Sequence, residues 1–328
     1  NAKILWTLGQ LPDSIRDRVL YSLVFSSLLP LTLRPPPPPP PAGVVSHVTV
    51  DVSSLKASLP FYEKLGMQAF PSSVAGAQFL AAGATGRRQP LLLLRENATM
   101  TERGPTWLAG MPRLCIYSTD VDADVRRLAE AGLEPMAPVA EDAMAKIAAY
   151  YDPDRYVVYL IEFKRPLGWA VRLQRAYHRI GDPMMFHLTV NVPKAEAGLR
   201  AFESLGFKTL NDQREDQVLY QLLAAFNIST TETSIKHIRL CKLPRDSHFM
   251  MCIMHWDKPR TEQTGAELLN SVTIAVNDVN AALDAAAAAG MRVEPAVTRV
   301  LPLYGEVAIG AAFVDGDSRV EFCCFASS

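Results

Sequence analysis

Two stretches of the chain share one pattern of apolar and polar residues. Residues 46–52 read SHVTVDV and residues 186–192 read FHLTVNV, and alternation with a period of two residues is typical of a half-buried strand. Each stretch is followed by apolar residues at helical spacing, in SLPFYEKLG and AGLRAFESLG. These segments end at Gly66 and Gly206, and glycine commonly ends a helix. The pattern predicts the same strand and helix twice.

Two further stretches follow a looser form of this plan. Residues 113–135 and 271–295 both give a strand, then DV[DN]A, an alanine-containing helix, Ala-Gly and a second strand that includes Glu-Pro. Apolar strand patterns also close the segments, for example at residues 152–166 and 313–325. We therefore predict an α+β fold of four modules, each made of a strand, a helix and two or three further strands.

The modules should pair, because a set of strands with a single helix buries only one of its faces. Pairing of neighbours gives one domain at residues 44–165 and another at residues 184–328, joined by a linker at 166–183 that contains a short helix. Pairing of the first module with the fourth, and of the second with the third, is the alternative. The pattern does not decide between the two arrangements.

Residues 1–43 have another composition and form an arm. An apolar run at residues 19–33 is interrupted by Pro30 and is shorter than the roughly 20 residues of a spanning helix. It predicts a short hydrophobic helix that docks on another protein subunit or lies at a membrane surface, with a full span as the less favoured alternative. The seven prolines at 35–41 predict a polyproline II spacer of roughly 20 Å. We expect residues 1–41 to contact a partner.

Composition narrows the class of protein and its compartment. Hydrophobic residues make up 49% and charged residues 20% of the 328 residues, and the formal net charge of -1 comes without a long basic run, which argues against nucleic acid as a partner. The five cysteines contain no CxxC pair, which argues against a disulfide framework or a structural zinc site. The chain begins without methionine, as a mature protein does after loss of a presequence. We expect an organelle, with the mitochondrion favoured over the plastid and the cytoplasm as the alternative.

The repeated phrases resemble the vicinal oxygen chelate superfamily, which contains glyoxalases, bleomycin-resistance proteins and extradiol dioxygenases. The resemblance rests on the HVTVDV and HLTVNV openings, the FYEKLGM and FESLGF helix ends, the two DV[DN]A openings and the DPDRYVVYLIEF ending, and it covers about residues 44–326. It implies four βαβββ modules paired into two cup-shaped, glyoxalase-like domains. It leaves the reaction open, because one fold hosts many functions.

In this superfamily a divalent metal lies inside a cup, on side chains from the first and last strands of the modules. The resemblance places the equivalent positions at His47, Arg113, His187 and Ser271 in the openings, and at one of Leu91 to Leu94, Tyr159, Cys252 and Glu321 in the last strands. Glu162 lies three residues after Tyr159, so strand alternation turns it to the opposite face.

Neighbour pairing would put His47 beside a leucine, Arg113 and Tyr159. A single imidazole beside a fixed cation does not hold a catalytic metal, although Arg113 with Tyr159 could grip an anionic ligand. The second cup would offer His187 and Glu321 as ligands of a weakly held divalent metal, with Cys252 as a poorer candidate.

The alternative pairing would bring His47 to Glu321, and His187 to Tyr159 and Arg113. Neither of these sets is complete. His47 is the poorest of the metal candidates, because neighbour pairing leaves it with a leucine, Arg113 and Tyr159. Plainer roles exist for the same residues: each histidine can be a hydrogen-bonded core residue, and Glu321 can form an ion pair with Arg319.

These positions favour a catalytically degenerate glyoxalase-like protein without a cofactor. It would act as an accessory subunit of a larger, membrane-associated organellar complex. The alternative is a metal-dependent lyase, isomerase or dioxygenase with its site in the second domain, where Glu321 would abstract a proton and the metal would polarise the substrate oxygen. A third hypothesis is metal-free capture of a small aromatic or anionic ligand in either cup.

Overall fold

The structure is a computed structural model, and it describes residues 39–83, 89–99, 107, 111–178, 180–214, 220–257, 271–314 and 318–325. The hydrophobic helix predicted at residues 19–33 and the first prolines of the spacer lie outside these residues. In the part of the chain that is described, no helix has the length and hydrophobicity needed to cross a membrane.

The first half of the described chain contains two modules with the predicted order of elements. The first module consists of β1 (Val45–Val52), α3 (Leu55–Lys64), β2 (Met67–Ala69), β3 (Ala77–Ala82) and β4 (Leu91–Glu96). The second consists of β5 (Arg113–Tyr117), α4 (Val121–Glu130), β6 (Ala140–Glu141), β7 (Ala145–Tyr151) and β8 (Val157–Phe163). A helix, α5 (Leu167–Tyr177), then occupies the expected linker.

The second half repeats the plan. The third module consists of β9 (Met184–Asn191), α6 (Ala195–Ser204), β10 (Lys208–Arg214), α7 (Tyr220–Ala225), β11 (Ile235–Lys242) and β12 (Met250–Trp256). The fourth consists of β13 (Ser271–Ala275), α8 (Val279–Ala288), β14 (Arg292–Leu301), β15 (Gly305–Val314) and β16 (Ser318–Cys324). Gly66 and Gly206 follow α3 and α6 with φ of 88° and 92°, a conformation that favours glycine. The predicted α+β fold of four modules is confirmed.

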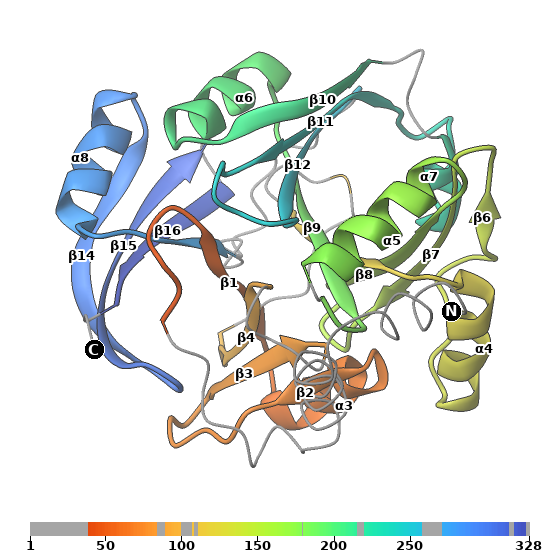
Figure 1. Cartoon of the computed structure of the whole chain (residues 1–328), viewed down its shortest axis with the longest axis horizontal. Helices are drawn as coiled ribbons and strands as arrows, with labels where there is room; N and C mark the ends of the chain where they lie inside the picture. The colour runs from red at the N-terminus through yellow and green to blue at the C-terminus, as the bar shows by residue number, and fades with distance from the viewer. Residues whose placement is uncertain are drawn as a thin grey trace, which may run out of the picture.

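The strands form two eight-stranded sheets. One has the order β14-β15-β16-β13-β1-β4-β3-β2 and the other β10-β11-β12-β9-β5-β8-β7-β6. We call the first the outer-module sheet, because it joins the first and fourth modules, and the second the inner-module sheet. The red-to-orange first module and the blue fourth module therefore share a sheet in Figure 1. Each sheet combines strands from residues 44–165 and 184–328, so the sheets do not follow the domain division expected from neighbour pairing.

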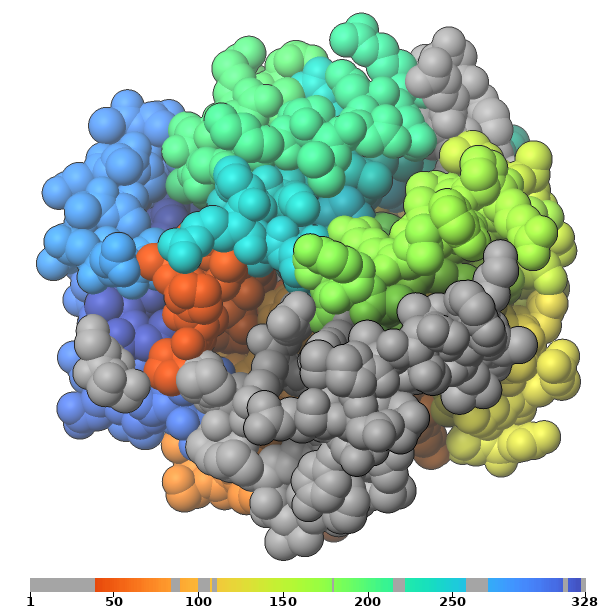
Figure 2. All heavy atoms as spheres, in the orientation of Figure 1, coloured from red at the N-terminus to blue at the C-terminus, as the bar shows by residue number. Residues whose placement is uncertain are grey.

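The opening strands of the modules make these joints. β1 pairs antiparallel with β13, and β5 pairs antiparallel with β9. Space-filling shows the same arrangement, with the orange-red start of the first module against the blue fourth module and the cyan third module (Figure 2). All four opening strands are buried along their length, so each suits the middle of a sheet equally well and the pattern cannot choose partners.

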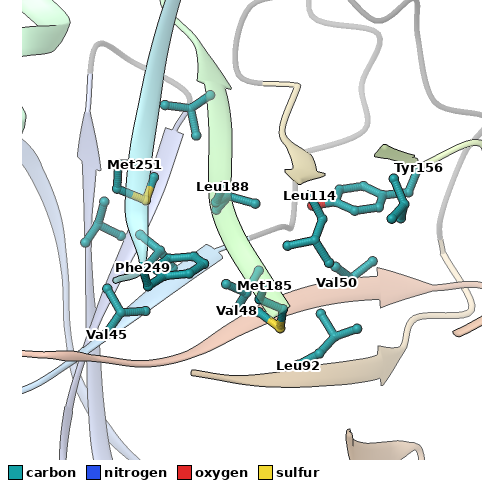
Figure 3. Close-up of a cluster of buried hydrophobic side chains, with 14 of the residues drawn as sticks. Val45, Val48, Val50, Leu92, Leu114, Tyr156, Met185, Leu188, Phe249 and Met251 are labelled. Atoms are coloured by element: carbon teal, nitrogen blue, oxygen red, sulfur yellow. The ribbon is translucent and has the colours of Figure 1, made fainter. Parts of the chain in front are cut away.

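The main hydrophobic core contains residues from both sheets. Val48 and Leu92 of the outer-module sheet belong to the same buried cluster as Leu114 and Leu188 of the inner-module sheet, and Figure 3 shows these side chains gathered between crossing strands. The cluster also includes side chains of α3, α6 and α8. The polar residues of the repeated phrases alternate with these core residues, so they occupy the opposite face of each sheet.

Candidate functional site

The strand registers define one set of candidate positions on each sheet. In the outer-module sheet, His47 is opposite Thr273, which lies beside Glu321, and Thr49 is opposite Ser271 and beside Leu93. The outer-module site is defined by His47, Thr49, Ser271 and Glu321, which are at most 3% exposed. The inner-module site is defined by Arg113, Tyr159, His187 and Cys252, which are at most 5% exposed.

Hydrogen bonds fix the tautomer of His47. The Ser46 hydroxyl donates to the carbonyl oxygen of Thr273 at 3.1 Å, so its oxygen is free to accept from His47 Nδ1 at 2.9 Å. Burial lowers the pKa of His47 to about 4 although Glu321 opposes the shift, so the ring is neutral near pH 7. The proton therefore sits on Nδ1, and Nε2 keeps its lone pair.

Glu321 is a buried carboxylate held by neighbours. Its oxygens accept from Arg319 Nε and from the Thr273 hydroxyl, each at 3.1 Å. Burial would raise the pKa of Glu321, but the charges of Arg319 and Arg95 outweigh it and the pKa is lowered. The ion pair with Arg319, considered from the sequence as the plainer role of Glu321, is present.

Three buried polar atoms of the outer-module site have no hydrogen-bond partner among the described residues. They are Nε2 of His47, Oγ1 of Thr49 and Oγ of Ser271. Leaving such an atom unpaired costs about 1–3 kcal/mol, and all three lie on one face of the neighbouring strands β1 and β13. Around them lie apolar side chains that include Phe79, Leu91 and Leu93.

The inner-module site is filled by its own side chains. Arg113 is fully buried and donates to Asn191 Oδ1 at 2.9 Å, and its guanidinium lies 5.3 Å from the ring centre of Phe226 and 5.6 Å from that of Trp256. Burial lowers the pKa of Arg113 to about 10, so the group remains a cation near pH 7. Leu222 and Leu223 of α7 belong to the same cluster as Tyr159.

His187 and Tyr159 are hydrogen-bonded to each other through His187 Nε2. The Tyr159 hydroxyl also lies 3.3 Å from Thr189 Oγ1. Burial, reinforced by Arg113, lowers the pKa of His187 to about 3, and burial raises the pKa of Cys252 to about 11. The His187 imidazole and the Cys252 thiol are therefore neutral. Nε2 of His187 is equivalent to the unpaired Nε2 of His47, but it is hydrogen-bonded to Tyr159.

Neither set of side chains fits a divalent metal. In the outer-module site Leu93 and Ser271 stand at two of the four ligand positions, and the one carboxylate, Glu321, is already bound to a guanidinium. In the inner-module site the single imidazole is bound to Tyr159 beside the cation of Arg113. Among the described residues no three His, Cys, Asp or Glu side chains converge on a metal position. Metal ions need several such donors.

The structure separates two residues that neighbour pairing of the modules would bring together. His187 lies on β9 of the inner-module sheet and Glu321 on β16 of the outer-module sheet, so they do not form one site. His47 instead shares a sheet with Glu321, as the alternative pairing required. Arg113 and Tyr159 do lie in one sheet, and Glu162 accepts a hydrogen bond from Val121 at the start of α4, on the face opposite Tyr159.

Sequence reasoning missed Thr49 and Ser46 as parts of the site. Thr49 could have been found from the alternation that places it two residues after His47 on the same face. The role of Ser46 could not, because it depends on a carbonyl oxygen of β13 from the other end of the chain.

Part of the chain matches the model of a known protein family. Residues 44–160 match the family model described as Glyoxalase/Bleomycin resistance protein/Dioxygenase superfamily. No curated protein matches the chain.

Solved structures extend the likeness over most of the chain. Glyoxalase I from Zea mays is 16% identical with a TM-score of 0.57, over 86% of this chain and 92% of that chain. A variant of the same maize enzyme gives 17% and 0.59, with the same coverage. A putative dioxygenase from Bacillus subtilis subsp. subtilis str. 168 is 12% identical with a TM-score of 0.57, over 88% of this chain and 86% of that chain. At these identities the likeness shows the fold alone.

The family match over residues 44–160 and the shared fold over most of the chain support the resemblance to the vicinal oxygen chelate superfamily. The resemblance that the repeated phrases indicated is therefore confirmed. The reaction does not follow from the family, because this fold serves enzymes and binding proteins alike.

Proposed function

We propose that this protein is a catalytically degenerate member of the superfamily, which binds a small polar ligand at the outer-module site without a metal and serves as an accessory subunit of a larger assembly. One observation carries the proposal: both sets of ligand positions contain or contact an arginine. Arg113 occupies one position of the inner-module site, and Arg319 is paired with Glu321 of the outer-module site. A fixed cation opposes a second cation at the same place.

The side chains of the outer-module site indicate the chemistry of the ligand. His47 Nε2 and the Glu321 carboxylate accept hydrogen bonds, and the hydroxyls of Thr49 and Ser271 can accept or donate. A ligand with hydroxyl or amino groups suits these atoms. Phe79 packs edge-on to the His47 ring, with centroids 5.3 Å apart, so an apolar or aromatic body suits the surroundings.

Exposed apolar side chains support the accessory role. Trp169, Leu173 and Tyr177 of α5 are 63%, 49% and 81% exposed, and their spacing of four residues puts them on one face of the helix. A stripe of this kind is typical of a surface that contacts another protein. The apolar run and proline spacer of residues 1–41 are the second contact that we propose.

A ligand screen tests the binding role. Aryl alcohols, phenols and aryl amines would be screened by thermal shift against the full chain, and hits would be titrated against Thr49→Val and Thr189→Val, which change the same position of the repeated phrase. We expect Thr49→Val to weaken binding by at least about fivefold, because it removes one ligand hydrogen bond, and Thr189→Val to leave it unchanged. The absence of hits, or equal loss in both variants, would contradict the proposal.

Native electrophoresis of extracts from the source cells tests the accessory role. The full chain should migrate in a large complex, and a chain that lacks residues 1–41 or carries Trp169→Ser with Tyr177→Ser should be released from it. Migration of the full chain as a monomer would contradict this role but would not bear on ligand binding, which the screen tests.

The alternative is a metal-dependent lyase, isomerase or dioxygenase. The observation in its favour is the free lone pair of His47 Nε2, with the other ring nitrogen bound, as in metal-ligating histidines. It requires close to one equivalent of bound metal that Glu321→Gln removes.

A further inference from the structure

A pocket of about 580 Å³ lies where the two sheets meet. Ser46, which bonds to His47, lines it, but none of the four residues that define each site does. One wall comes from the starts of β1 and β4 in the outer-module sheet, at residues 44–46 and 89–91. The opposite wall comes from residues 245–247 and 249 of the third module. Pockets of roughly 300–1,000 Å³ are the usual size of small-molecule sites.

The basic residues that line this pocket outnumber its acidic ones. Lys242, Arg245 and His178 line it, and Asp246 is the one carboxylate among its described lining residues. The Asp246 side chain accepts from the backbone nitrogen of Val45 at 3.2 and 3.4 Å, and burial raises its pKa to about 7. The carboxylate is therefore only partly ionised near pH 7 and does not balance the cations.

Arg245 is held in place by the segment that precedes β1. Its Nη1 donates to the carbonyl oxygen of Ala42 at 2.8 Å. Its Cδ lies 3.2 Å from the position that a side chain at Gly43 would occupy, so the glycine leaves room for the arginine stem. The other nitrogens of the Arg245 guanidinium have no hydrogen-bond partner among the described residues. Lys242 makes no ion pair within the same part of the chain. Both side chains are therefore available to bind an anion.

The remaining wall of the pocket is apolar. Pro39 to Pro41, Pro90, Phe249 and Tyr304 line it, and such surfaces suit an aromatic or aliphatic body. We propose that this pocket binds a small organic anion, with its carboxylate or phosphate on Lys242 and Arg245 and its apolar body against Phe249 and the prolines. Guanidinium and ammonium groups bind both kinds of anion. The inference stands apart from the proposed function, because it depends on other residues.

Calorimetric titration of the full chain tests this inference with three probes that share one aromatic body: 2-naphthoate, 2-naphthyl phosphate and the neutral 2-naphthamide. We expect at least one of the two anions to bind about tenfold or more tightly than the amide, because charge-assisted hydrogen bonds are the stronger ones. The tighter anion identifies the class of ligand.

Variants then locate the binding. Lys242→Ala and Arg245→Ala should each weaken binding of the preferred anion by about fivefold or more. Lys208→Ala and Arg126→Ala remove exposed basic residues elsewhere and should leave it unchanged. Anions that bind no better than the amide, no binding of any probe, or equal effects in all four variants would overturn the inference. Thr49→Val should not affect this titration, so its outcome is independent of the ligand screen.

Discussion

Thr49 and Thr189 occupy one position of the phrase that the chain repeats, and His47 and His187 occupy another, yet their surroundings differ. In the outer-module site Thr49 Oγ1 and His47 Nε2 have no hydrogen-bond partner among the described residues. In the inner-module site the equivalent atoms both bond to Tyr159, and Arg113 fills the space beside them. The same phrase therefore leaves the histidine Nε2 and the threonine Oγ1 unpaired in one sheet and bonded to Tyr159 in the other, where the unpaired histidine atom is Nδ1 of His187. The difference comes from the side chains on the neighbouring strands, such as Tyr159 on β8.

The largest expected effect is on the inner-module site. Arg113→Ala should lower the free energy of unfolding by about 3–5 kcal/mol, because it removes a buried cation that packs on Phe226 and Trp256 and leaves a void. Arg113→Met keeps most of the volume without the charge, and Asn191 keeps its bond from Trp256 Nε1 at 2.8 Å, so it should cost much less. Urea unfolding measures both.

Arg126→Ala is the control for Arg113→Ala, since Arg126 is exposed on α4 and its removal should change the free energy of unfolding by about 0.5 kcal/mol or less. If Arg113→Ala were as mild as this control, Arg113 would not be a structural part of a filled core. The contrast between the two sites would then be lost.

The second effect is on the pH dependence of stability. Burial puts the pKa of His47 near 4 and that of His187 near 3, both below the ordinary 6.5, so the unfolded chain binds protons that the folded chain does not. This stability is present above pH 6.5 and is lost as the pH falls toward the folded values, at up to about 1.4 kcal/mol per pH unit for each histidine.

Urea unfolding from neutral pH down to about pH 4 would measure this loss. His47→Gln and His187→Gln should each flatten the dependence in this window, because glutamine does not titrate. A dependence as steep as that of the unmodified chain in either variant would contradict the burial of that ring as a neutral group.

The smallest effect separates the two threonines most directly. Thr49→Val removes a buried hydroxyl that has no partner among the described residues, so it should raise the free energy of unfolding by about 1 kcal/mol. Thr189→Val removes a hydroxyl that lies 3.3 Å from the Tyr159 hydroxyl and should lower it by about 1 kcal/mol. Equal changes of the same sign, measured by chemical unfolding, would contradict the comparison.

The sequence predicted the modules well because their signals are local. Alternation gave the opening strands, Gly66 and Gly206 marked the helix ends, and the three-residue offset from Tyr159 correctly turned Glu162 to the other face. Each of these features depends on neighbours in the chain.

Pairing of the modules is a different kind of property. The four opening strands carry similar apolar patterns, so the choice of β13 for β1 depends on how the two complete sheets pack. The candidate site depends on this choice of partner, since it joins His47 to Glu321, a carboxylate that lies 274 positions further along the sequence. Only the alternative pairing brought these two residues together.

Metal content tests most directly whether either site holds a metal. The full chain would be purified without chelator and analysed for Zn, Ni, Fe and Mn by mass spectrometry, with Glu321→Gln as the matched variant. We expect less than about a tenth of an equivalent of any of these metals in both proteins, because each site has at most one imidazole and one carboxylate beside a guanidinium. Close to one equivalent in the unmodified chain, lost in Glu321→Gln, would contradict this expectation and support the metal-dependent enzyme.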